Sequence, residues 1–241
     1  MNVKLTLSFD GTYFYGWQVQ PNKRTVAGEL IKALKNFVDG DFKVIGCGRT
    51  DAGVHALNYV ANVRISGRLR VEVGELKYKL NKLLPDDIYV KRVETVNEDF
   101  HARFSAKSKV YRYVFLKGYN PLLRNRVYFI DYDLSVEKIE KSLKVFIGKH
   151  NFGGFSSDER DNRVCTIYGI SLSRVENLFY FEVEGDRFLR KMVRFMAGAV
   201  LMLAEGKITE GDITMSLHTG KKIKNLTPLP PYALYLLWVK Y

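Results

Sequence analysis

The segment from Gly46 to Ala56 holds the residue types best suited to catalysis. It reads G-C-G-R-T-D-A-G-V-H-A and places a guanidinium, a carboxylate and an imidazole within one short stretch. Three glycines disfavour a helix and predict a tight loop after a strand over 43–47. A carboxylate on such a loop, Asp51, beside Arg49, which can contact phosphate, suits catalysis on a nucleic acid. A structural turn in which Asp51 caps backbone amides fits the composition equally well.

A metal site in this segment is disfavoured. Cys47, Asp51 and His55 are spaced by four residues, which brings ligands together only on a helix. No second Cys/His cluster completes a zinc site, and the G-K-[ST] of a phosphate loop is absent. Cys165 and His150 leave a nucleophilic pair open, although a buried structural cysteine is the favoured interpretation.

A second segment, from Phe100 to Ile130, carries no Asp or Glu. Seven cations fall within it, interleaved with aromatic residues. Cations hold phosphates and aromatic faces stack on unpaired bases, so the pattern predicts an RNA-contacting surface. A strand over 108–116 would place Tyr111 and Tyr113 on one face with Lys109, and one of the two tyrosines fits a core position equally well.

A third segment is basic at helical spacing. Arg187, Arg190, Lys191 and Arg194 recur at intervals of three and four residues, and they would form one basic face of a helix over 187–205. Four cations on one face repel each other unless the face meets an anion. A solvated charged face, or partial burial against a carboxylate, remains open.

The whole chain is strongly basic. Its 241 residues have 38 Lys and Arg against 26 Asp and Glu, a formal net charge of +12. That surplus indicates a polyanionic partner. The sequence starts without the apolar run of a signal peptide and has no stretch long enough to span a bilayer. We therefore expect a cytoplasmic protein with no membrane partner.

Hydrophobic periodicity predicts an α+β protein of two similar halves, residues 1–105 and 106–241. The first half should run strand, helix, strand, strand, helix, strand over 3–9, 25–38, 43–47, 58–65, 72–84 and 88–96. The second half should have strands over 108–116, 165–174, 178–184 and 233–240 and helices over 135–147, 187–205 and 209–218.

Taken together, these segments resemble the tRNA pseudouridine synthase A (TruA) family over nearly the whole chain. The resemblance rests on F-D-G-T-x-F-x-G-W-Q-x-Q, G-R-T-D-A-G-V-H-A, F-H-A-R-F-S-A-x-x-K-x-Y-x-Y, F-I-G-K-H-N-F-x-x-F and G-x-x-F-L-x-x-M-V-R. The second of these motifs is highly specific. The chain departs from the family pattern near its end, where Thr227 and Ala233 replace Ala and Gly around an altered proline loop over 226–234.

The resemblance implies conversion of uridine to pseudouridine in the anticodon stem-loop of tRNA, roughly at positions 38 to 40 in standard tRNA numbering. The implied fold is two similar α+β halves joined by a mixed, mostly antiparallel sheet with a central cleft. A homodimer that binds the anticodon arm is implied, with no cofactor and no metal.

The resemblance also assigns roles by motif position. Asp51 corresponds to the catalytic aspartate, Tyr111 to the tyrosine that stacks on the target base and assists proton removal at C5, and Arg194 to the arginine that pairs with the aspartate. A neighbouring guanidinium favours the ionised carboxylate that catalysis needs. The residues expected to bind substrate are Arg49, Thr50, His55, Arg103, Lys109, Arg187 and Arg190.

Three other functions compete with this one. A non-catalytic RNA-binding module would share the charge and the aromatic residues but give Asp51 no role. A methyltransferase would need a G-x-G-x-x-G loop, which is absent. A metal-dependent nuclease would need clustered carboxylates, and Asp158, Glu159 and Asp161 lie too close together in one polar loop.

Overall fold

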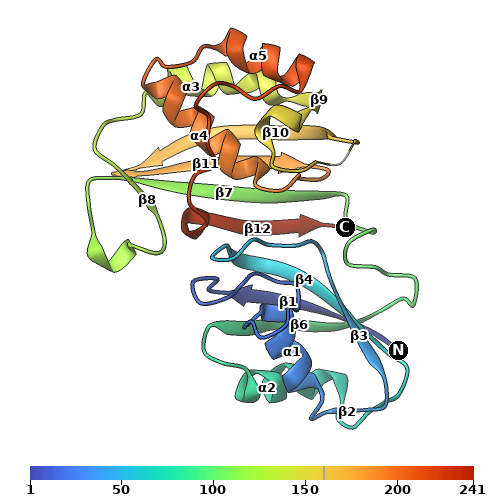
Figure 1. Ribbon diagram of the computed structural model, residues 1–241. Coiled ribbons are helices and arrows are strands. Elements are labelled where there is room, and N and C mark those ends of the chain that lie inside the picture. The colour runs from blue at the N-terminus through green and yellow to red at the C-terminus, as the bar shows by residue number, and fades with distance from the viewer. Residues whose placement is uncertain (160) are drawn as a thin grey trace. The chain divides into compact units, whose positions relative to one another are not determined.

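The chain folds into two compact α+β units. The structure, a computed structural model, describes residues 1–159 and 161–241. The first unit comprises Met1–Lys107 and Tyr235–Tyr241, and the second comprises Ser108–Leu234. Both units combine a mostly antiparallel sheet with helices (Figure 1). The α+β prediction is confirmed, and each unit is described by itself.

The sheet of the first unit is built around β1 (Asn2–Phe9). This strand pairs antiparallel with β4 (His55–Ile65) on one side and with β6 (Ile88–Val96) on the other. β3 (Phe42–Gly46) pairs antiparallel with β4, and the final strand β12 (Leu234–Lys240) pairs with β4 in parallel. Alternate residues of β1 are fully or almost fully buried, as a strand with one face on the core requires: Val3, Leu5, Leu7 and Phe9.

Two helices complete the first unit, α1 (Val26–Leu34) and α2 (Val73–Leu83). Thr25 caps α1 as expected, since its hydroxyl accepts a hydrogen bond from the Gly28 N–H. The helix ends before the predicted residue 38 because the chain turns there into a short strand, β2 (Val38–Asp39), which pairs with β5 (Arg68–Leu69).

The sheet of the second unit follows the order β7, β11, β10, β9. These strands are Ser108–Lys117, Leu178–Gly185, Val164–Val175 and Gly148–Asn151, and all neighbours are antiparallel. A short strand, β8 (Tyr128–Ile130), pairs in parallel with the end of β7.

Three α-helices belong to the second unit: α3 (Val136–Leu143), α4 (Met192–Ala204) and α5 (Glu210–Thr219). Short 3-10 turns lie at Pro121–Leu123, Lys144–Phe146, Phe152–Phe155 and Pro231–Ala233. Thr209 and Asp212 form a reciprocal capping box that fixes the start of α5. Within the described ranges, no helix is long and apolar enough to cross a membrane.

The predicted helix over 187–205 is wrong in its first turn, because α4 begins only at Met192. The Asp186 carboxylate accepts hydrogen bonds from the Thr166 and Arg187 N–H groups at 2.8 and 2.6 Å, which holds the chain against β10. Lys191 then adopts a left-handed conformation with φ of 62°, which no helix interior allows. The predicted basic helix face therefore does not exist.

Candidate active site

Asp51 lies on the loop between β3 and β4, at residues 47–54. The loop leaves the sheet where the Cys47 N–H donates to the Val60 carbonyl at 2.8 Å, and the Tyr59 hydroxyl donates to the Gly48 carbonyl. A tight turn follows, in which the Val54 N–H donates to the Asp51 carbonyl at 3.2 Å. Asp51 is half-buried on this turn and Arg49 is exposed. The glycine-rich loop predicted from the sequence is confirmed.

The loop after β1, residues 10–17, holds the Asp51 loop in place. The Gly53 N–H donates to the Phe14 carbonyl at 3.3 Å, and the Trp17 N–H donates to the Thr50 carbonyl at 3.4 Å. The two backbones lie so close that a Cβ on Gly16 would stand 2.3 Å from the Thr50 oxygen, and Gly16 also has a φ of 84°. A side chain at this position would therefore push the Asp51 loop out of place.

His55 lies beneath the loop rather than on its surface. Its side chain is only 4% exposed, and its ring stacks on Tyr235 with centroids 4.8 Å apart. Nδ1 lies 3.0 Å from the Gly11 N–H nitrogen and 3.1 Å from the Asp10 carboxylate. The Asp10 carboxylate also accepts from the backbone N–H and the hydroxyl of Thr12, at 3.0 and 2.6 Å. These contacts fasten one loop to the other.

Thr50 is also turned inward. The residue is buried, and its Oγ1 has no hydrogen-bond partner among the described residues. Of the loop residues expected to bind substrate, Arg49 is therefore exposed, whereas Thr50 and His55 are buried.

Arg24 fixes the supporting loop, and no local pattern of residues predicted this role. Its guanidinium makes two hydrogen bonds to the Asp87 carboxylate, at 2.7 and 2.8 Å, and lies 4.1 Å from the centre of the Phe14 ring. The hydrogen bond to Asp87 raises the pKa of Arg24 above its ordinary value. The Asp87 carbonyl also accepts the Asp10 N–H at 2.9 Å. Arg24 and Asp87 thus tie both ends of the loop that supports Asp51.

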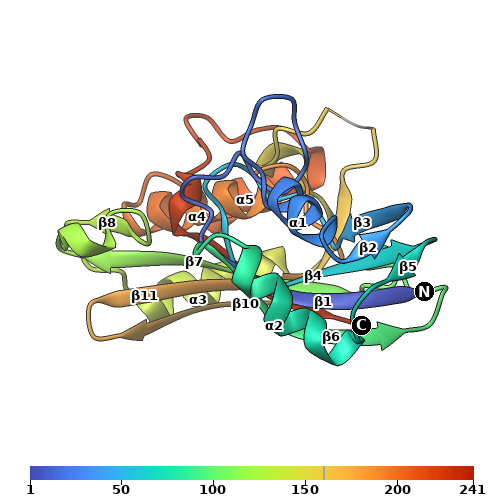
Figure 2. The same cartoon turned by 90° about the horizontal axis from the view of Figure 1, so that it is seen from below.

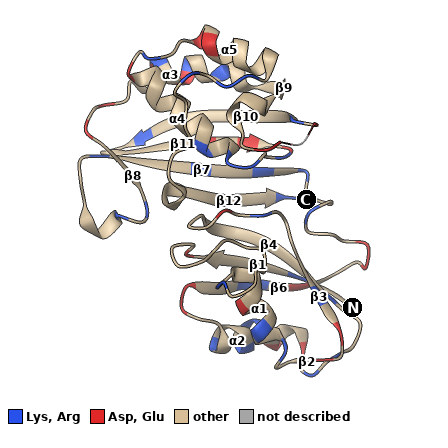
Figure 3. Ribbon diagram, viewed as in Figure 1, with Lys and Arg blue, Asp and Glu red and all other residues tan. Residues whose placement is uncertain are grey.

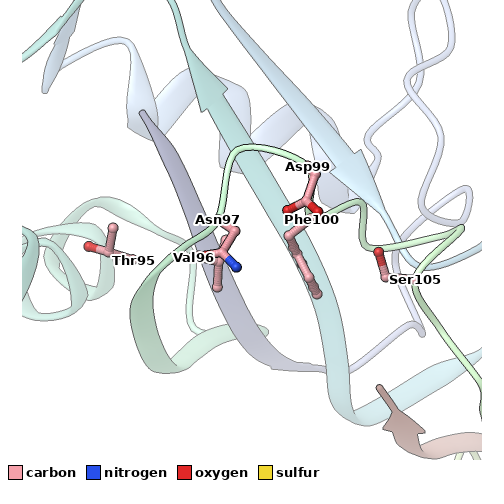
Figure 4. A pocket seen from close by; sticks show the side chains of 6 residues that line it. All are labelled: Thr95, Val96, Asn97, Asp99, Phe100 and Ser105. Carbon is pink, nitrogen blue, oxygen red and sulfur yellow. The ribbon is translucent and has the colours of Figure 1, made fainter.

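Arg103 belongs to a separate surface turn of the first unit. It is exposed, with its guanidinium 5.3 Å from the Phe104 ring centre. A shallow pocket at the end of β6 adjoins this turn and is lined by Thr95, Val96, Asn97, Asp99, Phe100 and Ser105 (Figure 4). The pocket contains one carboxylate and none of the residues predicted to act in catalysis.

In the second unit, the two candidate tyrosines both lie on β7 and differ in how deeply they are buried. Tyr113 is fully buried and donates a hydrogen bond to the Pro230 carbonyl at 2.8 Å, and burial raises the pKa of its phenol. Tyr111 is 9% exposed and meets the edge of Phe188, with ring centroids 5.0 Å apart. Both tyrosines are therefore buried, and Tyr113 is the more deeply buried of the two. Lys109 is partly exposed and lies opposite Gly185 in the ladder.

Arg194 stands in the first turn of α4 and is anchored to the divergent loop over 226–234. Its Nε donates to the Leu229 carbonyl at 2.6 Å, and the Leu229 N–H donates back to the Arg194 carbonyl at 3.2 Å. A Cβ on Gly198, one turn further along α4, would come within 2.7 Å of the Thr227 carbonyl oxygen. The altered proline loop is thus packed closely onto the helix that carries Arg194.

The two remaining basic residues, Arg187 and Arg190, lie in the segment before α4. Lys and Arg residues occur along both units (Figure 3). Arg187 donates from Nη2 to the Asn162 carbonyl at 3.2 Å. Arg190 has an exposed side chain, and its carbonyl accepts the Ser157 N–H at 3.1 Å. They share a segment with Phe188, which contacts Tyr111, but they do not share a helix face with Arg194.

The predicted site residues are divided between the units. Arg49, Thr50, Asp51, His55 and Arg103 belong to the first, and Lys109, Tyr111, Arg187, Arg190 and Arg194 belong to the second. Among the described residues, no group of three His, Cys, Asp or Glu side chains could hold a metal ion. Cys165 is buried in β10 opposite His150 of β9, whose Nε2 lies 2.9 Å from the Ile147 carbonyl.

Comparison with known proteins identifies the family. The family model described as tRNA pseudouridine synthase matches residues 6–105 and 143–241, which include both loops and the strand and helix segments around Arg194. The chain belongs to the tRNA pseudouridine synthase family. The family prediction is confirmed, and with it the prediction of an isomerase.

Relatives named tRNA pseudouridine synthase A match this family member from end to end. The protein of Dictyoglomus thermophilum is 41% identical over 100% of both chains. Those of Acetivibrio thermocellus and Thermoanaerobacter sp. strain X514 are 38% and 37% identical over 100% of this chain and 99% of theirs.

Proposed function

We propose that the chain isomerises uridine to pseudouridine in the anticodon stem-loop of tRNA, at positions 38 to 40, with Asp51 as its catalytic residue. One observation carries the proposal. A single half-buried carboxylate stands on a turn whose backbone is clamped by a second loop, with Gly16 allowing the close approach. Such fixed geometry is what a catalytic carboxylate needs, since small displacements from the reacting atoms are costly.

The reaction breaks the bond between the ribose C1′ and N1 of uracil, joins C1′ to C5, releases the C5 proton to solvent and places a proton from solvent on N1, so that no atom is gained or lost overall. The uridine must first leave its stack, which costs a few kcal/mol. Asp51 acts in its ionised form on the sugar or the base. The resemblance assigns Arg194 the role of the aspartate's partner, and it assigns Tyr111 stacking on the target base and assistance in removing the C5 proton. The two hydrogen bonds between Arg194 and Leu229 hold the arginine in position for that role.

The other site residues divide by exposure. Arg49, Arg103 and Arg190 are exposed, and Lys109 and Arg187 are partly exposed, so these five cations contact tRNA phosphates. Thr50 and His55 are buried. We assign them to positioning the Asp51 loop and not to direct contact with the substrate.

The enzyme acts as a homodimer. Support comes from the segment between β7 and β8, where Leu122 is 86% exposed and Tyr119 is 73% exposed. Exposed apolar side chains grouped in one segment are typical of a contact surface. Sedimentation equilibrium of the wild type and of Leu122→Glu tests this. The dimer should weaken in the variant, and a monomeric wild type would refute it.

The release of tritium from tRNA that carries [5-³H]uridine tests the activity. We expect release by the wild type with EDTA present and no added nucleotide. Chemical mapping of the pseudouridines should place them in the anticodon arm. Release from uridines elsewhere in the tRNA would refute the assigned region. Binding of tRNA without any release would support the RNA-binding module instead.

A further inference from the structure

The loop that supports Asp51 has a second face. Along residues 13–17 the aromatic side chains point alternately inward and outward. Phe14 and Trp17 are buried, with 2% and 4% of their surface exposed, whereas Tyr13 and Tyr15 are 71% and 50% exposed. Packing of the loop is complete without the two tyrosines, so core formation does not account for them.

The backbone that carries the two exposed tyrosines is held in place by contacts on either side of it. Phe14, between them, accepts the Gly53 N–H at 3.3 Å and is covered by the Arg24 guanidinium. The Tyr15 N–H donates to the Arg24 carbonyl at 2.9 Å. The loop rises from the face of the first unit's sheet on the side of α1 (Figure 2). The rings are therefore presented to solvent on the same clamped backbone that positions Asp51.

The charge of this loop matches a polyanion. Residues 11–28 contain no Asp or Glu. Of their two cations, Arg24 is paired with Asp87, and Lys23 lies beside the exposed Tyr15. Lys23 places its Nζ 4.3 Å from the centre of the Tyr15 ring. Exposed aromatic faces combined with a cation are how proteins hold unpaired nucleotides, with the faces stacking on bases and the cation meeting phosphate.

We propose that Tyr13 and Tyr15 form a stacking platform for unpaired nucleotides of the anticodon loop, beside the uridine that Asp51 acts on. This rests on the proposed function, because it assigns the loop nucleotides of the same substrate. The platform holds neighbouring bases once the target uridine has left its stack, and it thereby favours the flipped state.

The double substitution Tyr13→Ala/Tyr15→Ala tests the platform, with an anticodon stem-loop as substrate. We expect the KM for tritium release to rise by about tenfold or more, because each stacked base contributes substantially to binding. Tyr13→Phe/Tyr15→Phe should restore the KM, since it keeps the rings. A second measurement uses stem-loops that carry 2-aminopurine at single loop positions. Binding to the wild type should quench the 2-aminopurine fluorescence, and binding to the Ala double variant should not.

A matched control exists in the same unit. Tyr78 on α2 is 64% exposed, and Lys82 stands 4.3 Å from its ring centre, the same pairing as Lys23 and Tyr15. Tyr78→Ala should leave the KM and the quenching unchanged. An equal effect of Tyr78→Ala would overturn the proposal, since it would show a general surface effect.

The outcomes separate this proposal from the proposed function. If the wild type releases tritium and the Ala double variant keeps its KM and its quenching, the platform is refuted and the function stands. If the variant loses dimerisation instead, the tyrosines belong to an interface between copies and the platform is again refuted. If the wild type releases no tritium from the anticodon arm, both proposals fail.

Discussion

Two loop segments carry the candidate chemistry, and they are stabilised in different ways. The Asp51 loop is fastened to the loop over 10–17 by backbone hydrogen bonds and by contacts at glycine positions. The segment over 186–191 is held by side chains and backbone together. The Asp186 carboxylate accepts two backbone amides and Arg187 donates to a carbonyl, while the Asp186 N–H and the Arg190 carbonyl bond to backbone groups of Thr166 and Ser157. The Asp51 loop has in addition a close backbone approach at Gly16, which leaves no room for a side chain.

The largest effect on turnover should come from the close contact between the loop over 10–17 and the Asp51 loop, which we call the clamp. Gly16→Ala would place a Cβ 2.3 Å from the Thr50 carbonyl oxygen at a φ that favours glycine. We expect turnover to fall about 100-fold or more, as for other small displacements of reacting groups. The matched control is Gly74→Ala in α2, where a Cβ meets nothing within 4 Å. Tritium release by the two variants measures the difference, and equal activity would show that the clamp is unimportant.

Loss of the ion pair between Arg24 and Asp87, which supports the loop over 10–17, should lower turnover less. Arg24→Ala removes the two hydrogen bonds to Asp87 and the cover over Phe14. We expect about a tenfold loss of turnover as the loop loosens, without loss of the fold. Arg70→Ala breaks an ion pair to Asp39 in which both side chains are exposed, and it should leave turnover unchanged. Wild-type turnover in Arg24→Ala would show that the Arg24–Asp87 ion pair contributes to stability alone.

Tyr113→Phe should lower stability and spare the chemistry. The variant leaves the Pro230 carbonyl without its hydrogen bond, so we expect the free energy of unfolding to fall by about 1 kcal/mol. The pKa of Tyr113 is raised by burial from 10.0, so its contribution is present below pH 10 and declines as the pH rises, because only the unfolded phenol ionises. Denaturant unfolding from pH 8 to 11 should show the two proteins converging. Divergence would contradict the burial of this hydroxyl.

The smallest effect tests the segment before α4. Lys191 has a φ of 62°, so Lys191→Gly should leave the free energy of unfolding within about 0.5 kcal/mol or raise it. A helix reaching back to 187 would instead lose about 1 kcal/mol. Denaturant unfolding gives the sign, and a clear loss of stability would favour the helix.

Residue patterns predicted some of these features and could not predict others. Strand alternation located β1 and β6, and the cap Thr25 located the start of α1, because these signals are local. Three glycines around Asp51 indicated its loop for the same reason. The basic residues at 187–194 repeat with helical spacing, but the Asp186 carboxylate accepts the Thr166 amide of β10, and the helix starts only at Met192. Arg24 and Asp87 are 63 residues apart, so their pairing has no local signature.

Single-turnover tritium release by Asp51→Asn tests the central claim most directly. This change keeps the size of the side chain and removes its charge. We expect the variant to bind the anticodon stem-loop with wild-type affinity and to release no tritium, while Asp39→Asn, an exposed carboxylate of the same unit, releases it at the wild-type rate. Wild-type release by Asp51→Asn would contradict the account.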